Sequence, residues 1–546
     1  MQPKSKLQVK LHSGEQLEIF FTCEDPSLAD VLAAHGLPLN TRCGHRGLCR
    51  GCEVELCEGM LVTHQGKVQA PAKVQACRAQ LAEPLMIYLP VRSRLEHRPQ
   101  VSETFDIAIP YAHEPLFAAV AGVGDTAFAI DVGTTTVVVL LVDLITGTVL
   151  SRAGAFNEQI TFGDNVITRI AAAQTPENLT AMQHAIAMKT IQPLLVSACQ
   201  RAGRTMDRIA GGAVAGNTTM LHLLTGEDPT PLGTAPFSPR FIAGKMVSAH
   251  HLKLVADGLA PQTPVQLLPG FSAFVGADIT AGVFASGMVF DSDPSLLVDI
   301  GTNGEIVLQA GGQLYACATA AGPAFEGCGL RCGTRAREGA VSDLRLQLEP
   351  FALETLVIGK LPLTQANGLC GSAYVDFLAT ARSSGLLNAK GRFESGAWAR
   401  LPPQHRFFEA DERGVRLTEK DGEGSLFISE VDVALLLQAK AAIGAGIQIL
   451  LQTAGLRMAD LGRVYLAGGF GMHLNIANAI RIGLLPGFRE EQVCVVGNTS
   501  LAGALLAVVD RAALSEMEKL RARVIVVDLN LASGFEDCYI EQLMLP

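Results

Sequence analysis

Hydrophobic and polar residues alternate at the start of the chain. Apolar residues stand at every second position over residues 7–11 and again over residues 17–21, with a Ser-Gly turn between the two runs. A period of two predicts a β-hairpin with one buried face. A short helix is expected next, because Ser27 can cap its first turn, Asp30 follows three residues later and Gly36 can end it.

After the first quarter of the chain the pattern changes to short apolar runs separated by turns. Runs over residues 128–132 and 137–142 and a third near Val149 predict three meandering strands. Helical patterns follow, of which residues 182–202 form the longest. Residues 209–224 then predict a strand that continues through Gly-Asn into an apolar helix.

The most informative run covers residues 296–305, with the sequence Leu-Leu-Val-Asp-Ile-Gly-Thr-Asn-Gly-Glu. Residues 128–136 have the same pattern of an apolar strand followed by Asp-x-Gly-Thr, in the sequence Phe-Ala-Ile-Asp-Val-Gly-Thr-Thr-Thr. Gly133 and Gly301 permit close backbone approach. The turn amides and threonine hydroxyls can donate to phosphate oxygens, and the aspartate of each run can hold a metal through water. One such turn is typical of an ordinary hairpin, but the pair predicts a nucleotide clamped between two related half-domains.

Two glycines end a further predicted strand. Residues 464–471 run into Gly468 and Gly469, which can offer a flat backbone surface to an adenine or ribose, with a plain turn as the alternative. Residues 495–505 repeat the Gly-Asn-Thr sequence found within residues 209–224. The predicted order is therefore phosphate turn, connecting helix, phosphate turn, adenosine turn and connecting helix.

The composition narrows the class of protein. The chain has 546 residues, enough for several domains, and 49% of them are hydrophobic, enough for sizeable cores. Its formal net charge of -10 argues against nucleic-acid binding, which needs a basic surface. The apolar stretches 137–142 and 433–451 are too short or too interrupted to predict a membrane span, and the start has no apolar signal core, so a cytoplasmic location is expected.

Six of the 13 cysteines fall within the first 77 residues. Cys43, Cys49 and Cys52 have five and two residues between them, and 24 residues separate Cys52 from Cys77. Three thiolates in one glycine-rich loop and a fourth from a distant loop are typical of a two-iron cluster. Zinc is the main alternative, although it usually binds paired Cys-x2-Cys motifs and one pair is missing here.

Two resemblances to known families rest on these motifs. Residues 1–95 resemble a 2Fe-2S ferredoxin domain of the β-grasp kind, with the cysteine spacing of its adrenodoxin-like branch. Residues 125–546 resemble an ATPase of the superfamily shared by sugar and acetate kinases, actin and the heat-shock chaperones. The expected fold is multidomain: a β-grasp α+β domain, a linker over 96–124, and a two-lobed α/β actin-like ATPase of duplicated ribonuclease-H-like design, with lobes over 125–222 and 223–546.

The second resemblance implies roles for particular residues. In that superfamily the two phosphate turns grip the nucleotide from opposite lobes, and the two connecting helices cross at the hinge. The roles of organising Mg-ATP and its attacking water fall on Asp131 and Asp299. The nucleotide contacts fall on Gly133, Thr134, Thr135, Gly301, Thr302, Asn303, Gly468 and Gly469. Asn303 departs from the glycine that many members have at that position.

The whole chain resembles the reductive activators of corrinoid-dependent enzymes. This resemblance implies an ATP-hydrolysing electron transferase that passes one electron from its 2Fe-2S cluster to the Co(II) corrinoid of a partner methyl-transfer protein and restores Co(I). The implied cofactors are the cluster, ATP and Mg, and the implied cluster ligands are Cys43, Cys49, Cys52 and Cys77. The implied partners are a corrinoid protein of a methyltransferase system and a separate electron donor, and a homodimer is one option.

Other functions stay open at this point. An activator of 2-hydroxyacyl-CoA dehydratases has the same ATPase type, but shares a four-iron cluster across a dimer. The chain could also activate another low-potential enzyme, or be a ferredoxin-fused small-molecule kinase that phosphorylates an acceptor. A carrier or redox-sensing scaffold would not turn over ATP.

Several remaining features are expected to be structural. Cys23 and Cys57 are expected as small core residues. The Gly- and Arg-rich loop 327–337 has two cysteines but no second pair, so no metal is expected there. Its arginines, Arg331, Arg335 and Arg337, could steer an acidic partner or a phosphate, but a solvated loop neutralised by Glu326, Glu338 and Asp343 is expected. Gly371 and Ser372 are expected to open an ordinary helix, although their backbone amides could also touch the ligand.

Overall fold

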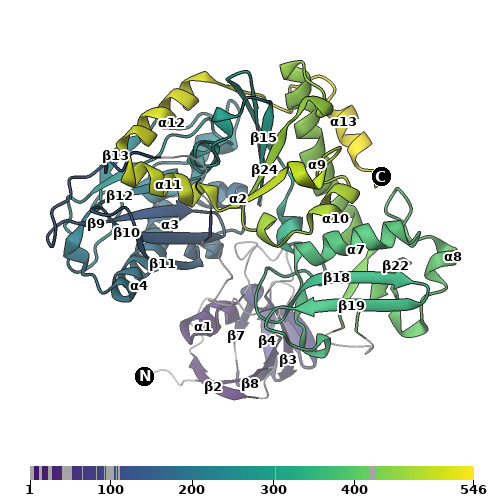
Figure 1. The fold of residues 1–546 in the computed structure, drawn as a ribbon. Coiled ribbons are helices and arrows are strands. Elements are labelled where there is room, and N and C mark those ends of the chain that lie inside the picture. Colours follow the sequence, from purple (N-terminus) through teal and green to yellow (C-terminus); the bar gives the residue numbers. More distant parts are fainter. Residues whose placement is uncertain are drawn as a thin grey trace.

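The computed structural model describes residues 5–11, 15–21, 27–39, 52–63, 66–81, 83–90, 93, 104–105, 107, 111–301, 303–409, 411–418 and 425–546, and every structural statement refers to these residues. Their strands form one five-stranded sheet, two six-stranded sheets and three three-stranded sheets, drawn in Figure 1.

The N-terminal sheet contains the predicted hairpin. β1 (Ser5–Leu11) and β2 (Gln16–Phe21) pair antiparallel, and β8 (Leu85–Leu89) lies parallel to β1 on its other side. β3 (Glu53–Glu58) and β6 (Ala72–Gln75) complete the order β2-β1-β8-β3-β6. The predicted helix is α1 (Leu28–Ala34), and it begins where Ser27 accepts a hydrogen bond from the Asp30 N–H at 3.2 Å.

The first large sheet defines what we call the first lobe. Its order is β11 (Val149–Phe156), β10 (Thr136–Asp143), β9 (Thr126–Val132), β12 (Ile209–Gly216), β14 (Pro264–Leu267) and β13 (Lys245–Ser248). The predicted meander is the antiparallel set β9-β10-β11, and β12 continues the sheet parallel to β9. The helices of this lobe include α2 (Val166–Ala172), α3 (Pro176–Ile186), α4 (Gln192–Ala202) and α5 (Thr218–Thr225).

The second large sheet defines the second lobe and repeats this topology. Its order is β25 (Val493–Gly497), β24 (Arg463–Ala467), β15 (Ser295–Ile300), β16 (Gly304–Ala310), β17 (Gln313–Thr319) and β26 (Val524–Val526). As in the first lobe, three antiparallel strands, β15-β16-β17, are followed by two strands parallel to the first of them, β24 and β25. The duplication inferred from the two phosphate turns therefore extends to five strands of each sheet, whereas the sixth strands lie at opposite edges, β13 beside β14 in the first lobe and β26 beside β17 in the second.

The boundary between the lobes differs from the expected one. The first lobe was expected to end at residue 222, but β13 and β14 belong to its sheet: β14 pairs with β12, and β13 pairs with β14. These strands are only four residues long and lie in a Pro- and Gly-punctuated stretch, so their pattern was too short to be recognised. The sheet of the second lobe begins with β15.

The two helices that cross are not both the predicted ones. α11 (Thr499–Val509) was expected, but its partner is α6 (Ala277–Ala285), whereas α5 was predicted from the repeated Gly-Asn-Thr sequence. A Cβ on Gly503 would lie 2.5 Å from the Cβ of Ala281, and one on Gly282 would lie 2.6 Å from Thr499 Oγ1. The two helices thus meet nearly backbone to backbone, which only glycine permits here.

The second lobe carries two small sheets and its longest helix. The small sheets are β19 (Phe351–Val357), β18 (Ala340–Leu348) and β20 (Gly368–Leu369), and β21 (Arg406–Glu409), β22 (Glu412–Arg416) and β23 (Phe427–Ser429). The further helices are α7 (Gly371–Ser383), α8 (Ser395–Trp398), α9 (Glu430–Ala454), α10 (Ile476–Arg481), α12 (Arg511–Arg523) and α13 (Phe535–Gln542). Among the described residues α9 alone has the length and hydropathy of a membrane span, but 78% of its most apolar window is buried inside the protein, as expected of a core helix.

Candidate nucleotide and redox sites

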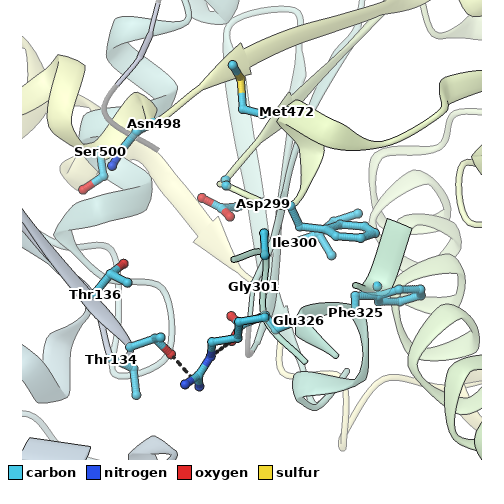
Figure 2. Close-up of a pocket in the computed structure, with 18 of the residues that line it drawn as sticks. Thr134, Thr136, Asp299, Ile300, Gly301, Phe325, Glu326, Met472, Asn498 and Ser500 are labelled. Atoms are coloured by element: carbon cyan, nitrogen blue, oxygen red, sulfur yellow. Dashed lines mark hydrogen bonds and ion pairs between the residues drawn. The ribbon is translucent and has the colours of Figure 1, made fainter. Parts of the chain in front are cut away.

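A cavity of about 720 Å³ lies between the two lobes. Figure 2 shows Thr134 and Thr136 on one side of it and Asp299 and Gly301 on the other. The structure brings together every predicted nucleotide residue that it describes: Asp131, Gly133, Thr134, Thr135, Asp299, Gly301, Asn303, Gly468 and Gly469 all line this cavity. Thr302 lies outside the described residues.

The first phosphate turn is held from behind by the segment that follows β11. Asn157 donates from Nδ2 to the Gly133 carbonyl at 3.0 Å and from its backbone N–H to the Thr135 carbonyl at 2.8 Å. The Thr134 carbonyl accepts from Arg169 Nη2 at 2.5 Å. Asn157 and Arg169 are fully buried and neither lines the cavity, so these carbonyls point away from it. In a planar trans peptide the next N–H points the opposite way, which turns the amides of this turn toward the cavity.

The second phosphate turn leaves space for a ligand. The Gly301 N–H donates to the Asn303 carbonyl at 3.0 Å, and a Cβ on Gly301 would meet no atom of the described residues closer than 3.7 Å. Packing against the protein therefore does not require glycine at this position. Gly133 differs, because a Cβ there would lie 2.7 Å from the Thr136 carbonyl oxygen. The glycine of the second turn is best explained by room for something bound in the cavity.

Four carboxyl groups gather at the bottom of the cavity: Asp131, Asp278, Asp299 and Glu305. Burial, followed by the charges of neighbouring carboxylates, raises the pKa of Asp299 to about 7 and that of Asp278 to about 8. Burial also raises the pKa of Asp131 and of Glu305. Carboxylates crowded in this way share protons unless a cation neutralises them, and oxygen-rich acidic sites of this kind suit Mg²⁺.

Asp131 is oriented by the N-terminus of α11. Asn498 Nδ2 donates to its Oδ2 at 2.8 Å and Ser500 Oγ donates to its Oδ1 at 2.7 Å. Asn498 also caps α11 by accepting from the Leu501 N–H at 2.9 Å. The start of α11 thus fixes the Asp131 carboxylate at the end of β9. This contact links the crossing helix α11 to the first phosphate turn.

The glycine pair after β24 lies directly against the second aspartate. Gly468 has φ +87, and a Cβ there would lie 2.5 Å from Asp299 Oδ1. A side chain at this position would displace the carboxylate. Gly469, Phe470 and Met472 continue the same wall of the cavity and give it an apolar section beside the phosphate turns.

The family models match almost all of this two-lobed part. Residues 126–291 match the model described as the RACo middle region, and residues 293–546 match the C-terminal domain of RACo, the ASKHA domain. A curated relative, "Corrinoid activation enzyme RamQ" from Eubacterium limosum, is 31% identical over 548 residues, which cover 88% of this chain and 90% of the relative. The chain belongs to the RACo family of corrinoid reductive activators.

Two further comparisons agree with membership of the RACo family. A reductase of the Co(II) methylated amine-specific corrinoid protein from Methanosarcina barkeri is 24% identical over 444 residues, or 76% of each chain. The solved structure titled "Reductive activator for corrinoid,iron-sulfur protein" superposes with a TM-score of 0.71 at 29% identity and covers 99% of this chain and 98% of that one. The two lobes are accordingly an actin-like ASKHA ATPase, and the chain is an enzyme of the reductive activase class.

The cavity also contains residues to which the sequence analysis gave no role: Asn217, Asp278, Glu305, Asn498 and Ser500. It contains Glu326 and Arg335 as well, for which a solvated loop was the expected place. A signal existed for Asn217 and Asn498, because they occupy the same position in the repeated Gly-Asn-Thr sequence. Asn217 Nδ2 donates to Thr134 Oγ1 at 3.0 Å, so both asparagines reach the first phosphate turn from the start of a helix. Asp278 and Arg335 stand in no repeated motif, and only the fold brings them to the cavity.

Loop 327–337 is only partly the solvated loop that was expected. Arg331 fits that expectation, since it pairs with Glu409 and Glu412 and lies over the ring of Phe427. Arg335 contradicts it, because this side chain lines the cavity and its Nη2 lies 3.3 Å from Thr135 Oγ1.

The helix start at Gly371 is also more than an ordinary helix start. Cys370, Gly371 and Ser372 all line the cavity, so the beginning of α7 forms part of its wall. A Cβ on Gly371 would overlap the Phe325 carbonyl oxygen, which explains the glycine by packing.

Two of the four predicted cluster ligands are described, and they lie together. Cys52 stands just before β3 and Cys77 lies in the short 3-10 helix after β6; both are buried. Hydrogen bonding from the Cys77 thiol lowers the pKa of Cys52 to about 6. Cys43 and Cys49 lie outside the described residues, as does Cys23. The described residues contain no three His, Cys, Asp or Glu side chains placed to hold one metal ion directly, so the carboxyl groups of the cavity would hold Mg²⁺ only through water. Cys57 is exposed, so its expected place in the core is wrong.

Proposed function

We propose that this protein uses ATP to drive the transfer of one electron to the Co(II) corrinoid of a partner methyl-transfer protein, which returns the corrinoid to Co(I). Full-length similarity to named corrinoid activators supports the substrate class. The observation that carries the proposal is the joint presence, in one chain, of a two-lobed nucleotide cavity and a buried pair of thiols at the N-terminal sheet.

For the redox part, we propose that Cys43, Cys49, Cys52 and Cys77 hold a 2Fe-2S cluster. The strand order β2-β1-β8-β3-β6, with β1 parallel to β8 and α1 following the first hairpin, is that of a β-grasp sheet and supports a ferredoxin-like domain. A cluster bound there would supply single electrons at a low potential. Cys52 and Cys77 fit this role because burial limits water access and because the lowered pKa of Cys52 favours the thiolate that binds iron.

For the nucleotide part, we propose that the turn amides at Thr134 and Thr135 and the open face of Gly301 bind the phosphates of ATP. Asp131 and Asp299 would hold Mg²⁺ through its water shell and orient the attacking water. Mg²⁺ would neutralise developing charge on the phosphates. Gly468 and Gly469 would lie against the adenosine, because neither carries a side chain and their wall of the cavity continues into the apolar side chains of Phe470 and Met472.

The decisive experiment mixes the photoreduced protein with a Co(II) corrinoid protein under anaerobic conditions and follows the Co(I) absorption band. Co(I) is expected to accumulate with ATP and Mg²⁺, and not with ADP or without nucleotide. Asp299→Asn is expected to abolish the ATP-dependent part, while the exposed Asp411→Asn is expected to retain it. Equal Co(I) formation with and without ATP would exclude the proposal.

The same preparation distinguishes the alternatives. A small-molecule kinase would form a phosphorylated organic product, whereas this proposal predicts free phosphate. A cluster shared across a dimer within the ATPase would give about four irons per dimer bound outside the N-terminal segment, whereas this proposal predicts two irons per chain bound within it.

A further inference from the structure

We propose that Arg335 binds the terminal phosphate of ATP from across the cleft and makes the site distinguish ATP from ADP. The inference rests on the ATP-binding part of the proposed function and is independent of the corrinoid. It assigns a substrate contact to a residue of the second lobe that lies next to the phosphate turn of the first.

Arg335 bridges the two lobes. Its loop begins after the 3-10 helix Pro323–Glu326 of the second lobe, yet its Nη2 lies 3.3 Å from Thr135 Oγ1 in the first phosphate turn. Its guanidinium carbon also lies 5.8 Å from the ring centre of Phe156 at the end of β11. One side chain of the second lobe therefore touches the first lobe at the point where the turn amides face the cavity.

The hydrogen bonds of Arg335 leave room for a further acceptor. Its Nε is buried and has no hydrogen-bond partner among the described residues. The nearest carboxylate oxygen, Glu326 Oε2, lies 3.7 Å from Nε, which is an ion pair but too long for a hydrogen bond. A buried guanidinium N–H without an acceptor is costly. A phosphate group brought into the cavity supplies planar pairs of oxygens, and arginine binds these through two parallel N–H donors.

The charge of the cavity points to the same ligand. Arg335 is the only arginine or lysine among the described lining residues, whereas five carboxyl groups line the same cavity: Asp131, Asp278, Asp299 and Glu305, and Glu326, which lies 3.7 Å from Arg335 Nε. Mg²⁺ held at the carboxylates would neutralise only part of a nucleotide triphosphate. Arg335 sits beside the first phosphate turn and offers the remaining positive charge. ADP lacks the phosphate that would reach it, so loss of the guanidinium affects ATP far more than ADP.

Arg331 provides a matched control in the same loop. Its guanidinium pairs with Glu409 and Glu412 and lies 4.9 Å from the ring centre of Phe427, so it is committed to the small sheet β21-β22-β23. It does not line the cavity. Removing this guanidinium alters the loop without removing a donor from the nucleotide.

The test uses the full chain and measures dissociation constants for Mg-ATP and Mg-ADP by calorimetry, together with kcat for ATP hydrolysis. For Arg335→Gln we expect ATP binding to weaken about tenfold, ADP binding to change less than about twofold, and kcat to fall about 100-fold. Arg335→Lys keeps the positive charge but not the two parallel N–H donors. It is expected to lose less ATP affinity and less kcat than Arg335→Gln. Arg331→Gln is expected to leave both affinities and kcat within about twofold.

Chemical rescue is a third measurement, and it tests whether the guanidinium group of Arg335 is what the variant lacks. Guanidinium ion added to Arg335→Ala is expected to restore part of the hydrolysis rate and to leave Arg331→Ala unchanged. Equal weakening of ATP and ADP in Arg335→Gln, no weakening of either, or a wild-type protein that binds ADP as tightly as ATP would each overturn the inference. A wild-type protein that prefers ATP through Arg335 but forms no Co(I) would overturn only the corrinoid function.

Discussion

Arg169 donates a hydrogen bond from Nη2 to the backbone carbonyl oxygen of Thr134 at 2.5 Å. The guanidinium is fully buried, and it also donates to the Gly163 carbonyl, Gln159 Oε1 and the Met220 sulfur, none of which is charged. Burial lowers its pKa to about 9, so it stays protonated at neutral pH. A buried cation thus stands directly behind the turn proposed to bind phosphate.

This arrangement predicts the effect of Arg169→Lys. Lysine keeps the charge, but it cannot donate to the Thr134 and Gly163 carbonyls in one plane, so the turn loses its position. We expect KM for ATP to rise about tenfold with a smaller change in kcat. The control is Arg201→Lys, an exposed arginine that also donates to a backbone carbonyl, that of Arg152 at 2.7 Å. An unchanged KM together with a lowered unfolding midpoint would show that Arg169 acts on stability alone.

The proposed cluster ligands give a second prediction. Cys77→Ser is expected to remove the visible absorption of the reconstituted protein and most of the two irons per chain, because a serine oxygen is a poorer terminal ligand of iron than a cysteine thiolate. Cys57→Ser should keep the iron and the spectrum, since Cys57 is exposed on β3. Iron analysis and absorption spectra after anaerobic reconstitution measure both. Full iron content in Cys77→Ser would remove this residue from the ligand set.

Local patterns predicted the parts of the fold that one segment determines by itself. The hairpin at residues 7–21, both phosphate turns and the glycines after β24 could be recognised because each is a strand with a defined end. Asp278 and Arg335 could not, because they reach the cavity only when α6 and loop 327–337 pack against the first lobe. No local pattern contains that information.

The crossing helices also show what a local sequence pattern cannot predict. The Gly-Asn-Thr repeat indicated two helices, and the asparagine at the start of each donates to a residue of the run 128–136, but the repeat did not indicate which helix crosses α11. The deciding signal was a helix with a small residue at the contact, and Gly282 of α6 provides it opposite Thr499. A search for glycines in apolar helices would have favoured α6 over α5.

This contact predicts that Gly503→Ala destabilises the protein. The new Cβ would lie 2.5 Å from the Cβ of Ala281 and 2.6 Å from its backbone, so α6 and α11 must move apart. Overpacking of this kind costs about 1–3 kcal/mol of unfolding free energy. Gly396→Ala in α8 is the control, because a Cβ there meets nothing within 4 Å. Chemical unfolding of both variants measures the difference, and equal midpoints would contradict close packing of the crossing helices.

The ion pair at the start of β9 predicts a pH-dependent stability. Hydrogen bonding from Arg208 holds the pKa of the Asp125 carboxyl well below its usual value of 3.8. The folded state therefore binds fewer protons than the unfolded chain at low pH, so the contribution of Asp125 is complete above about pH 5 and is lost as the pH falls toward 2. Asp125→Asn should be less stable than wild type at pH 7, and this difference should close on acidification.

Urea unfolding of wild type and Asp125→Asn at pH 7, 5 and 3 measures this change. The control is Glu516→Gln, which removes an exposed pair with Lys519 on α12 and should change stability by less than about 0.5 kcal/mol. A difference between wild type and Asp125→Asn that stays constant from pH 7 to pH 3 would mean that the carboxylate charge is not the cause.

The last prediction concerns the segment that leads from the N-terminal sheet to the ATPase. Thr104 lines the nucleotide cavity, and its carbonyl accepts from the Asn498 N–H at 3.1 Å, while Phe105 pairs with Gly497 at the end of β25. The side chain of the same Asn498 donates to Asp131. The connection to the proposed redox domain is thus fixed to the residue that orients a proposed catalytic carboxylate.

Gly497→Ala is therefore expected to uncouple hydrolysis from electron transfer. Gly497 has φ +71, and a Cβ there would collide with the Thr104 carbonyl oxygen, so residues 104–105 must leave their place. The amount of Co(I) formed per ATP hydrolysed should fall about tenfold, within the usual range of coupling between sites. Gly455→Ala is the control, because Gly455 has φ +68 with nothing within 4 Å, so it carries the same backbone strain without the collision. Equal Co(I) yields per ATP in the two variants would show that this contact does not transmit the state of the nucleotide.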